Sequence, residues 1–166
     1  MIPRFKFVTT TTIFLCLLGC GTSASRYLTQ REDFLLLDEP AGAIGVLELS
    51  ETIEGEQDVV IVGQIGGVTD PWSPGLANFV MADPVAIIEG EGHPESCDCP
   101  FCKKTAEQAE GLALVEFLNK HGEVLRVDAQ KLFDIEKDLM VVVRGRARMD
   151  DLGHLVVAAR GLYVRR

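Results

Sequence analysis

The strongest fold signal in this 166-residue chain is residues 141–164, which read VVVRGRARMDDLGHLVVAARGLYV. Small and apolar residues alternate with arginines from Val143 to Met149, and a second apolar run extends from Leu155 to Val164. The turn-forming residues Asp-Asp-Leu-Gly at 150–153 separate the two runs. Alternation with a period of two is typical of a half-buried strand, so the stretch predicts an antiparallel hairpin.

The segments upstream of the hairpin repeat this pattern. Strands are predicted at 59–65, 78–83 and 112–119, because each is mostly apolar; Gly66-Gly67, Pro84 and His121-Gly122 then mark the connections after them. A short helix is predicted at 129–135, with Leu132 and Phe133 facing inward. Four minor elements are also expected, helices at 43–53 and 103–110 and short strands at 85–89 and 124–127.

Five strands with a short helix before the last two predict a small closed barrel. This order resembles the OB-fold. Three motifs are similar to those of OB-fold proteins of the bacterial envelope, namely Val-Gly-Gln-Ile-Gly at 62–66, Phe-Val-Met-Ala-Asp at 79–83 and Val-Val-Arg-Gly-Arg at 142–146. The resemblance covers residues 57–165 and implies a mainly β, five-stranded barrel within a domain at 34–166, with a Cys/His loop inserted at 90–105. A fragment of a β-sandwich is the alternative.

The N-terminus is organised like an export signal. Met1 to Lys6 is short and basic, and Phe7 to Leu18 is mostly apolar. About a dozen apolar residues cannot span the roughly 30 Å of a bilayer core as a helix. A basic start, an apolar stretch and a small-residue cleavage site are typical of a secretory signal peptide.

The apolar stretch ends in Leu17-Leu18-Gly19-Cys20, which resembles the lipobox of bacterial lipoproteins. The resemblance implies a signal peptide at 1–19, a lipidated Cys20 as the first mature residue and a tether at 20–33. The domain is then expected outside the cytoplasm, anchored on the outer side of the inner membrane or in the outer membrane, facing the periplasm. Ordinary cleavage after Ala24 is the alternative.

The charge of the chain constrains its partners. The formal net charge is −9. Removal of residues 1–19 takes away Arg4 and Lys6 and leaves 14 basic against 25 acidic groups, a net charge of −11. Nucleic-acid binding depends on neutralising phosphates, so a nucleic-acid partner is not expected. The expected partners are the membrane, through the lipid, and a protein or small ligand of unknown identity.

The most distinctive motif lies in the expected loop. His93, Cys97, Cys99 and Cys102 have the spacing H-x3-C-x-C-x2-C. Two cysteines spaced C-x2-C around a turn can direct both sulfurs at one ion, and the other two residues complete a Cys3His set. A closed tetrahedral site of this composition is typical of structural Zn²⁺, so zinc is the expected cofactor.

Other chemistry is open to the same residues. An exported protein meets an oxidising compartment, so two of the three cysteines beyond Cys20 could form a disulfide. Cys99-Pro100-Phe101-Cys102 also resembles the active pair of glutaredoxin-type proteins, which makes a thiol-disulfide redox protein the runner-up. Thiolates with one imidazole also suit Cu(I).

Three arginines of the hairpin form a second candidate site. Arg144, Arg146 and Arg148 share one face of their strand, and Arg160 of the partner strand extends the row. Two interpretations are open, a face that binds anions and a solvated barrel exterior whose arginines pair with carboxylates. Few aromatic residues are available for base stacking, which favours the solvated exterior.

The remaining candidates favour binding over catalysis. His121 and His154 lie in or beside turns, and no serine has the context of a nucleophile elbow. Trp72, in a loop between two prolines, is expected to plug one end of the barrel. The sequence therefore predicts a lipid-anchored binding or scaffolding protein with a metal site and no enzymatic activity.

Overall fold

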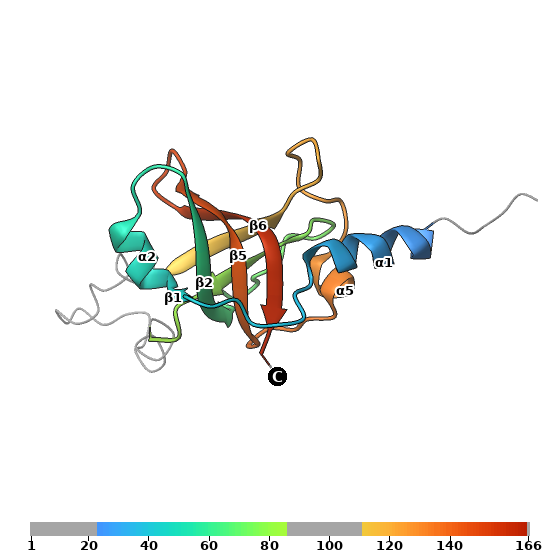
Figure 1. Ribbon diagram of the computed structural model, residues 1–166, viewed down its shortest axis with the longest axis horizontal. Helices are drawn as coiled ribbons and strands as arrows, with labels where there is room; N and C mark the ends of the chain where they lie inside the picture. The colour runs from blue at the N-terminus through green and yellow to red at the C-terminus, as the bar shows by residue number, and fades with distance from the viewer. Residues whose placement is uncertain (1–22, 86–110, 166) are drawn as a thin grey trace, which may run out of the picture.

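The protein is a mainly β domain whose long strands close into an OB-like barrel, as the sequence predicts (Figure 1). The computed structural model describes residues 23–85 and 111–165, with side chains from residue 29 onward. The five strands of the barrel are β2 (Gln57–Ile65), β3 (Asn78–Ala82), β4 (Leu112–Phe117), β5 (Met140–Met149) and β6 (Leu155–Val164).

The strand pairings produce closure. The strands follow the order β2-β3-β4-β6-β5, and β5 pairs again with β2 along Gln57–Gln64. Neighbours are antiparallel except for β4 and β6, which run parallel. Helix α5 (Ala129–Phe133) lies in the connection from β4 to β5, where a short helix is predicted. Closure leaves none of the five strands with a long unpaired edge.

The barrel interior follows the alternation of the sequence. In β5, Val141, Val143 and Ala147 are fully buried, whereas the arginines between and after them are exposed. Val157 of β6 is also fully buried, as expected for the apolar face of the predicted hairpin. The largest buried side chains of the core are Phe79, Phe117, Phe133, Leu49, Ile61, Ile65, Met81 and Leu162.

Residues 23–33 of the expected tether are helical. Helix α1 (Ser23–Phe34) packs at one end of the barrel beside α5 (Figure 1). The ring of Phe34 lies edge-on against Phe117 and Phe133, with ring centroids 5.2 and 6.2 Å apart. These contacts belong to Phe34, the first residue of the expected domain, and join it to residues 83 and 99 positions further along the chain.

The chain then crosses the outside of the barrel. Leu35 forms a parallel bridge with Leu162, and the Leu36 amide donates to the Leu162 carbonyl at 2.9 Å. Figure 1 shows the following residues passing in front of β6, β5 and β2 before they reach β1 (Ile44–Gly45), which pairs parallel with β2. Helix α2 (Val46–Thr52) follows at the opposite end of the barrel from α1.

The minor elements give a mixed outcome. Helix α2 lies within the helix expected at 43–53, while 124–127 contributes only an isolated bridge between Leu118 and Val124. That strand prediction is wrong, because the chain turns at once into α5. The elements expected at 85–89 and 103–110 lie outside the described residues, apart from Val85, which is helical and not extended as expected.

Candidate functional site

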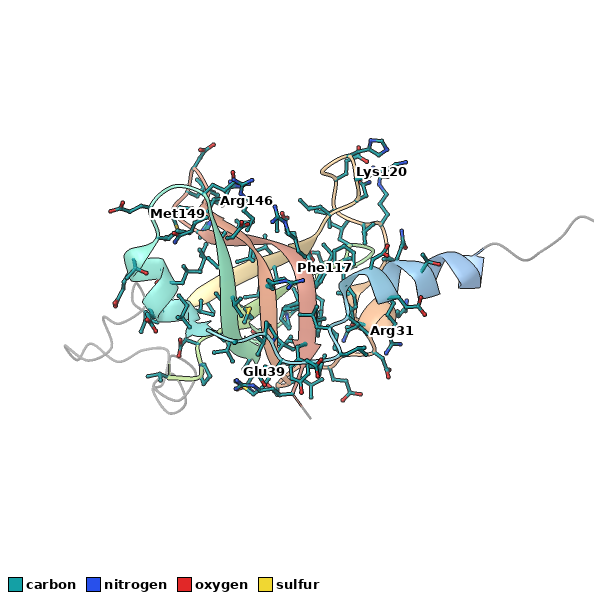
Figure 2. The ribbon with its side chains drawn as sticks, viewed as in Figure 1. Arg31, Glu39, Phe117, Lys120, Arg146 and Met149 are labelled. Carbon is teal, nitrogen blue, oxygen red and sulfur yellow. The ribbon has the colours of Figure 1, made fainter. Side chains whose placement is uncertain are left out.

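The arginine row lies where the alternation predicts, on the outer face of β2, β5 and β6. Arg144, Arg146 and Arg148 are all exposed, and Arg146 is labelled in Figure 2. In the register of the sheet, Arg146 stands opposite Asp58 of β2 and Ala158 of β6. Successive arginines are about 6.6 Å apart along the strand, the repeat of alternate residues.

Part of this row is neutralised by carboxylates of the same face. The Arg146 guanidinium lies 3.5 Å from Glu56, and Arg160 reaches over β5 to donate to Asp58 at 3.1 Å. All four of these side chains are about half exposed or more, so each ion pair contributes little to stability. Arg144 makes no ion pair within the described residues. The face is therefore mixed in sign.

The crossing segment closes one end of this face. Glu39 of that segment accepts a charge-assisted hydrogen bond from Arg165 at 2.5 Å, which lowers the pKa of the Glu39 carboxyl. Val142 points outward like the arginines, yet it is fully buried near this end of β5. The usable part of the arginine face therefore begins at Arg144.

Asp83 organises the neck at which the chain leaves β3 and enters β4. It is 7% exposed, and its carboxylate accepts from the amides of Val85 at 3.0 Å and Leu47 at 3.2 Å. Leu47 is the second residue of α2, where amides have no partner in the helix, so Asp83 caps α2 from a distance. In the sequence this aspartate is only the last residue of the strand expected at 78–83. A Cβ on Gly45 would lie 2.5 Å from the Asp83 carboxylate, which explains the glycine there.

The residues of the two main predicted sites lie outside the described residues. They are the four expected metal ligands, His93, Cys97, Cys99 and Cys102, and the expected lipidation site, Cys20. Within residues 23–85 and 111–165, no three His, Cys, Asp or Glu side chains group as a metal site would require. In the same residues no helix has the length and apolar character needed to cross a membrane.

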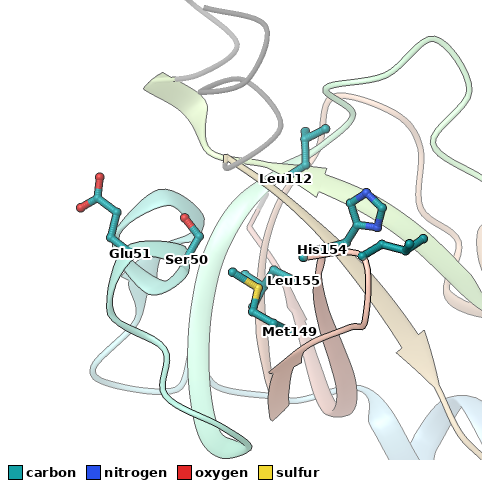
Figure 3. A pocket seen from close by; sticks show the side chains of 8 residues that line it. Ser50, Glu51, Leu112, Met149, His154 and Leu155 are labelled. Carbon is teal, nitrogen blue, oxygen red and sulfur yellow. The ribbon is translucent and has the colours of Figure 1, made fainter.

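One cavity was not predicted from the sequence. It lies between α2 and the turn that joins β5 to β6, and its volume is about 370 Å³ (Figure 3). This is within the usual size range of small-molecule sites. The residues that line it are Ser50, Glu51, Leu112, Met149, Leu152, Gly153, His154 and Leu155. The sequence places them in three separate segments, so only the folded chain brings them together.

A network of hydrogen bonds fixes the turn beside this cavity. The Asp150 carboxylate accepts from the amides of Leu152 at 2.9 Å and His154 at 2.8 Å, and its second oxygen lies 3.2 Å from the His154 ring. The bond from the His154 amide, followed by that from Leu152, holds the pKa of Asp150 below its usual value. Gly153 completes the turn with a φ of +82°. His154 therefore helps to stabilise the turn through its interactions with Asp150.

Two further residues considered in the sequence, Trp72 and His121, have structural roles. Trp72 packs edge-on against Phe79 with ring centroids 6.0 Å apart and is half-buried against the core. His121 lies in an exposed turn, where its amide donates to the side chain of Asn119 at 2.8 Å.

The strand order of the chain is that of an OB-like barrel, and the cavity and the arginine face lie on the outside of that barrel. No protein-family model matches the chain, and a search of curated proteins finds no similar sequence.

Proposed function

We propose that this protein is a lipid-anchored binding or scaffolding module of the bacterial envelope, with a Cys/His metal site in the insertion between β3 and β4. The lipid is attached to Cys20, and the metal is zinc, held by His93, Cys97, Cys99 and Cys102. The OB-like barrel is the scaffold on which the metal site and the binding surfaces are displayed.

The observation that carries this proposal is the closed neck of the insertion. Ala82 and Leu112 are direct partners in the ladder of β3 and β4, and the Asp83 amide donates to the Gly111 carbonyl at 2.8 Å. The pairing of β3 with β4 is therefore complete without residues 84–110. A segment that the barrel does not need, with four potential ligands within ten residues, supports a separate metal-binding role.

Helix α1 adds a consequence for the anchor. Only Gly21 and Thr22 separate Cys20 from Ser23, where α1 begins. Since Phe34 at the other end of α1 packs into the barrel end, a lipid on Cys20 would hold the barrel by a helix of about 18 Å rather than by a long loose chain.

Metal analysis with a free-thiol count on the purified full chain tests the metal site. We expect one zinc ion per chain in the wild type and none in the Cys99→Ser/Cys102→Ser variant. Thermal unfolding of the barrel should change little between the two, because the neck closes without the insertion. A chain with no metal and a Cys99–Cys102 or Cys97–Cys102 disulfide would contradict the metal site. An easily reduced Cys99–Cys102 pair would favour the redox alternative.

Membrane fractionation tests the anchor independently. We expect the wild type in the membrane fraction and Cys20→Ala unprocessed or released, because lipobox processing needs the thiol. Cys20→Ser should behave in the same way. The diacylglyceryl group supplies two acyl chains, which a stable anchor requires. Equal membrane association of the wild type and Cys20→Ala at mature length would rule out lipidation.

A further inference from the structure

Four of the eight residues that line the cavity between α2 and the β5–β6 turn are large and apolar, namely Leu112, Met149, Leu152 and Leu155. Leu112 and Leu155 contribute to its lining, and Met149 lies beside Leu155 in the centre of the view (Figure 3). Met149 is 39% exposed and Leu152 is 81% exposed. These two are among only five large apolar side chains that are exposed in the described part of the chain. Apolar residues gathered at a cavity mark an interaction site more often than apolar residues scattered singly.

The rim of the cavity is rigid. The carboxylate of Asp150 binds two amides of the turn, and the Gly153 amide donates to the Asp150 carbonyl at 3.0 Å. On the other side, Asp83 caps α2, and Leu49 anchors that helix in the core. A site held in one conformation loses less entropy on binding, so its apolar contacts contribute more to affinity.

The two described segments that form most of the cavity are acidic. Residues 46–54 and 149–155 contain no lysine or arginine, although Arg148 directly precedes Met149 and His154 lines the cavity. The five acidic residues of these two segments are Glu48, Glu51, Glu54, Asp150 and Asp151. Glu51 is one of the lining residues, and in Figure 3 its carboxylate points outward from α2, away from Met149 and Leu112. A partly apolar cavity beside acidic segments is complementary to a group that is apolar and flanked by positive charge.

We propose that this cavity binds a partner polypeptide through an apolar side chain that lies next to a lysine or arginine. The apolar side chain contacts Met149, Leu152 and Leu112, and the cation lies toward Glu51. This gives the barrel a protein-binding surface at the α2 end. The inference goes beyond the proposed anchor and metal site and depends on neither.

Selection from a library of random displayed peptides on the immobilised full chain tests the proposal. We expect the recovered peptides to carry an apolar residue beside Lys or Arg. They should bind the Met149→Ser/Leu152→Ser variant at least about tenfold more weakly, because two anchor contacts of the site are lost. Leu37→Ser is the matched control, since Leu37 is 95% exposed on the crossing segment, and it should leave the affinity unchanged.

A charge reversal tests the second half of the proposal. Glu51→Lys should weaken binding of the same peptides about threefold, the effect of reversing one exposed charge, while Glu136→Lys, an exposed glutamate before β5, should not. Recovery of no peptide above background, recovery of acidic peptides, or equal affinity for the Met149→Ser/Leu152→Ser variant would each overturn the proposal. All variant positions are exposed, and an unchanged melting temperature confirms that each variant is folded.

Discussion

The middle and the tip of the β5–β6 hairpin belong to the same two strands but present different surfaces. In the middle, arginines face outward among carboxylates that neutralise some of them. At the tip, Met149 and Leu152 are exposed at a cavity formed mostly by two acidic segments. The two regions have different neighbours. The middle of the hairpin pairs with β2 of the same sheet, whereas the tip faces α2 across the cavity.

This comparison separates what a strand pattern can and cannot reveal. The arginine row follows from a period of two, so its position and exposure were predictable from local sequence. The cavity depends on α2, which is placed against the hairpin by the fold and by Asp83. The surface proposed for a partner therefore lies at the tip, which is the region with the weaker sequence pattern.

The largest expected effects come from the inner face that both regions share. Val143→Ala and Val157→Ala should each lower the free energy of unfolding by about 1–3 kcal/mol, because each removes buried methyl groups and leaves a cavity. Chemical denaturation of the full chain measures the loss. A loss no greater than that of an outward-facing arginine variant would mean that the inner and outer faces of the hairpin are reversed.

The second expected effect sharpens the difference at the tip. Asp150→Ala removes the acceptor of two turn amides, so amide hydrogen exchange at Leu152 and His154 should rise about tenfold through local opening. Exchange in the middle of the hairpin should not change. Asp151→Ala is the matched control, because Asp151 is exposed in the same turn and accepts no hydrogen bond in the described structure. Equal exchange in both variants would show that the turn does not depend on Asp150.

Acid should have the same effect on the tip as the Asp150 variant. The folded turn lowers the pKa of Asp150, so its contribution to the turn is complete above the unfolded value of about 3.9 and is lost as the pH falls through the lower folded value. Exchange corrected for its intrinsic pH dependence should therefore rise at Leu152 below about pH 4. Asp150→Ala should show no such rise; if it does, another group is responsible.

The sequence predicted the regular parts of the molecule better than the contacts between them. All five barrel strands and α5 were predictable, because each has a local pattern that the fold preserves. The packing of α1 was not predictable, because Phe34 contacts Phe117 and Phe133, which lie 83 and 99 positions further along the chain. Asp83 was predicted only as the last residue of a strand, and its bond to the Leu47 amide spans 36 positions and has no local signature.

The candidate sites divide in the same way. The arginine row was predicted with its exposure, and its ion pairs with Glu56 and Asp58 support a solvated exterior. The cavity could not be predicted from the sequence. The only local feature is the pair Met149 and Leu152 on either side of two aspartates, and this pattern indicates only a turn. The Cys/His site and the lipid anchor remain predictions from their motifs.

The smallest expected effect tests the middle of the hairpin. Arg146→Ala should lower the free energy of unfolding by less than about 0.5 kcal/mol, because its pair with Glu56 is 3.5 Å long and open to solvent. Arg144→Ala, which breaks no ion pair within the described residues, serves as the control and should have no larger effect. A loss near that of Val143→Ala would mean that Arg146 is buried and paired in solution. The middle of the hairpin would then be an ordered polar site, and it would replace the tip as the first place to look for a partner.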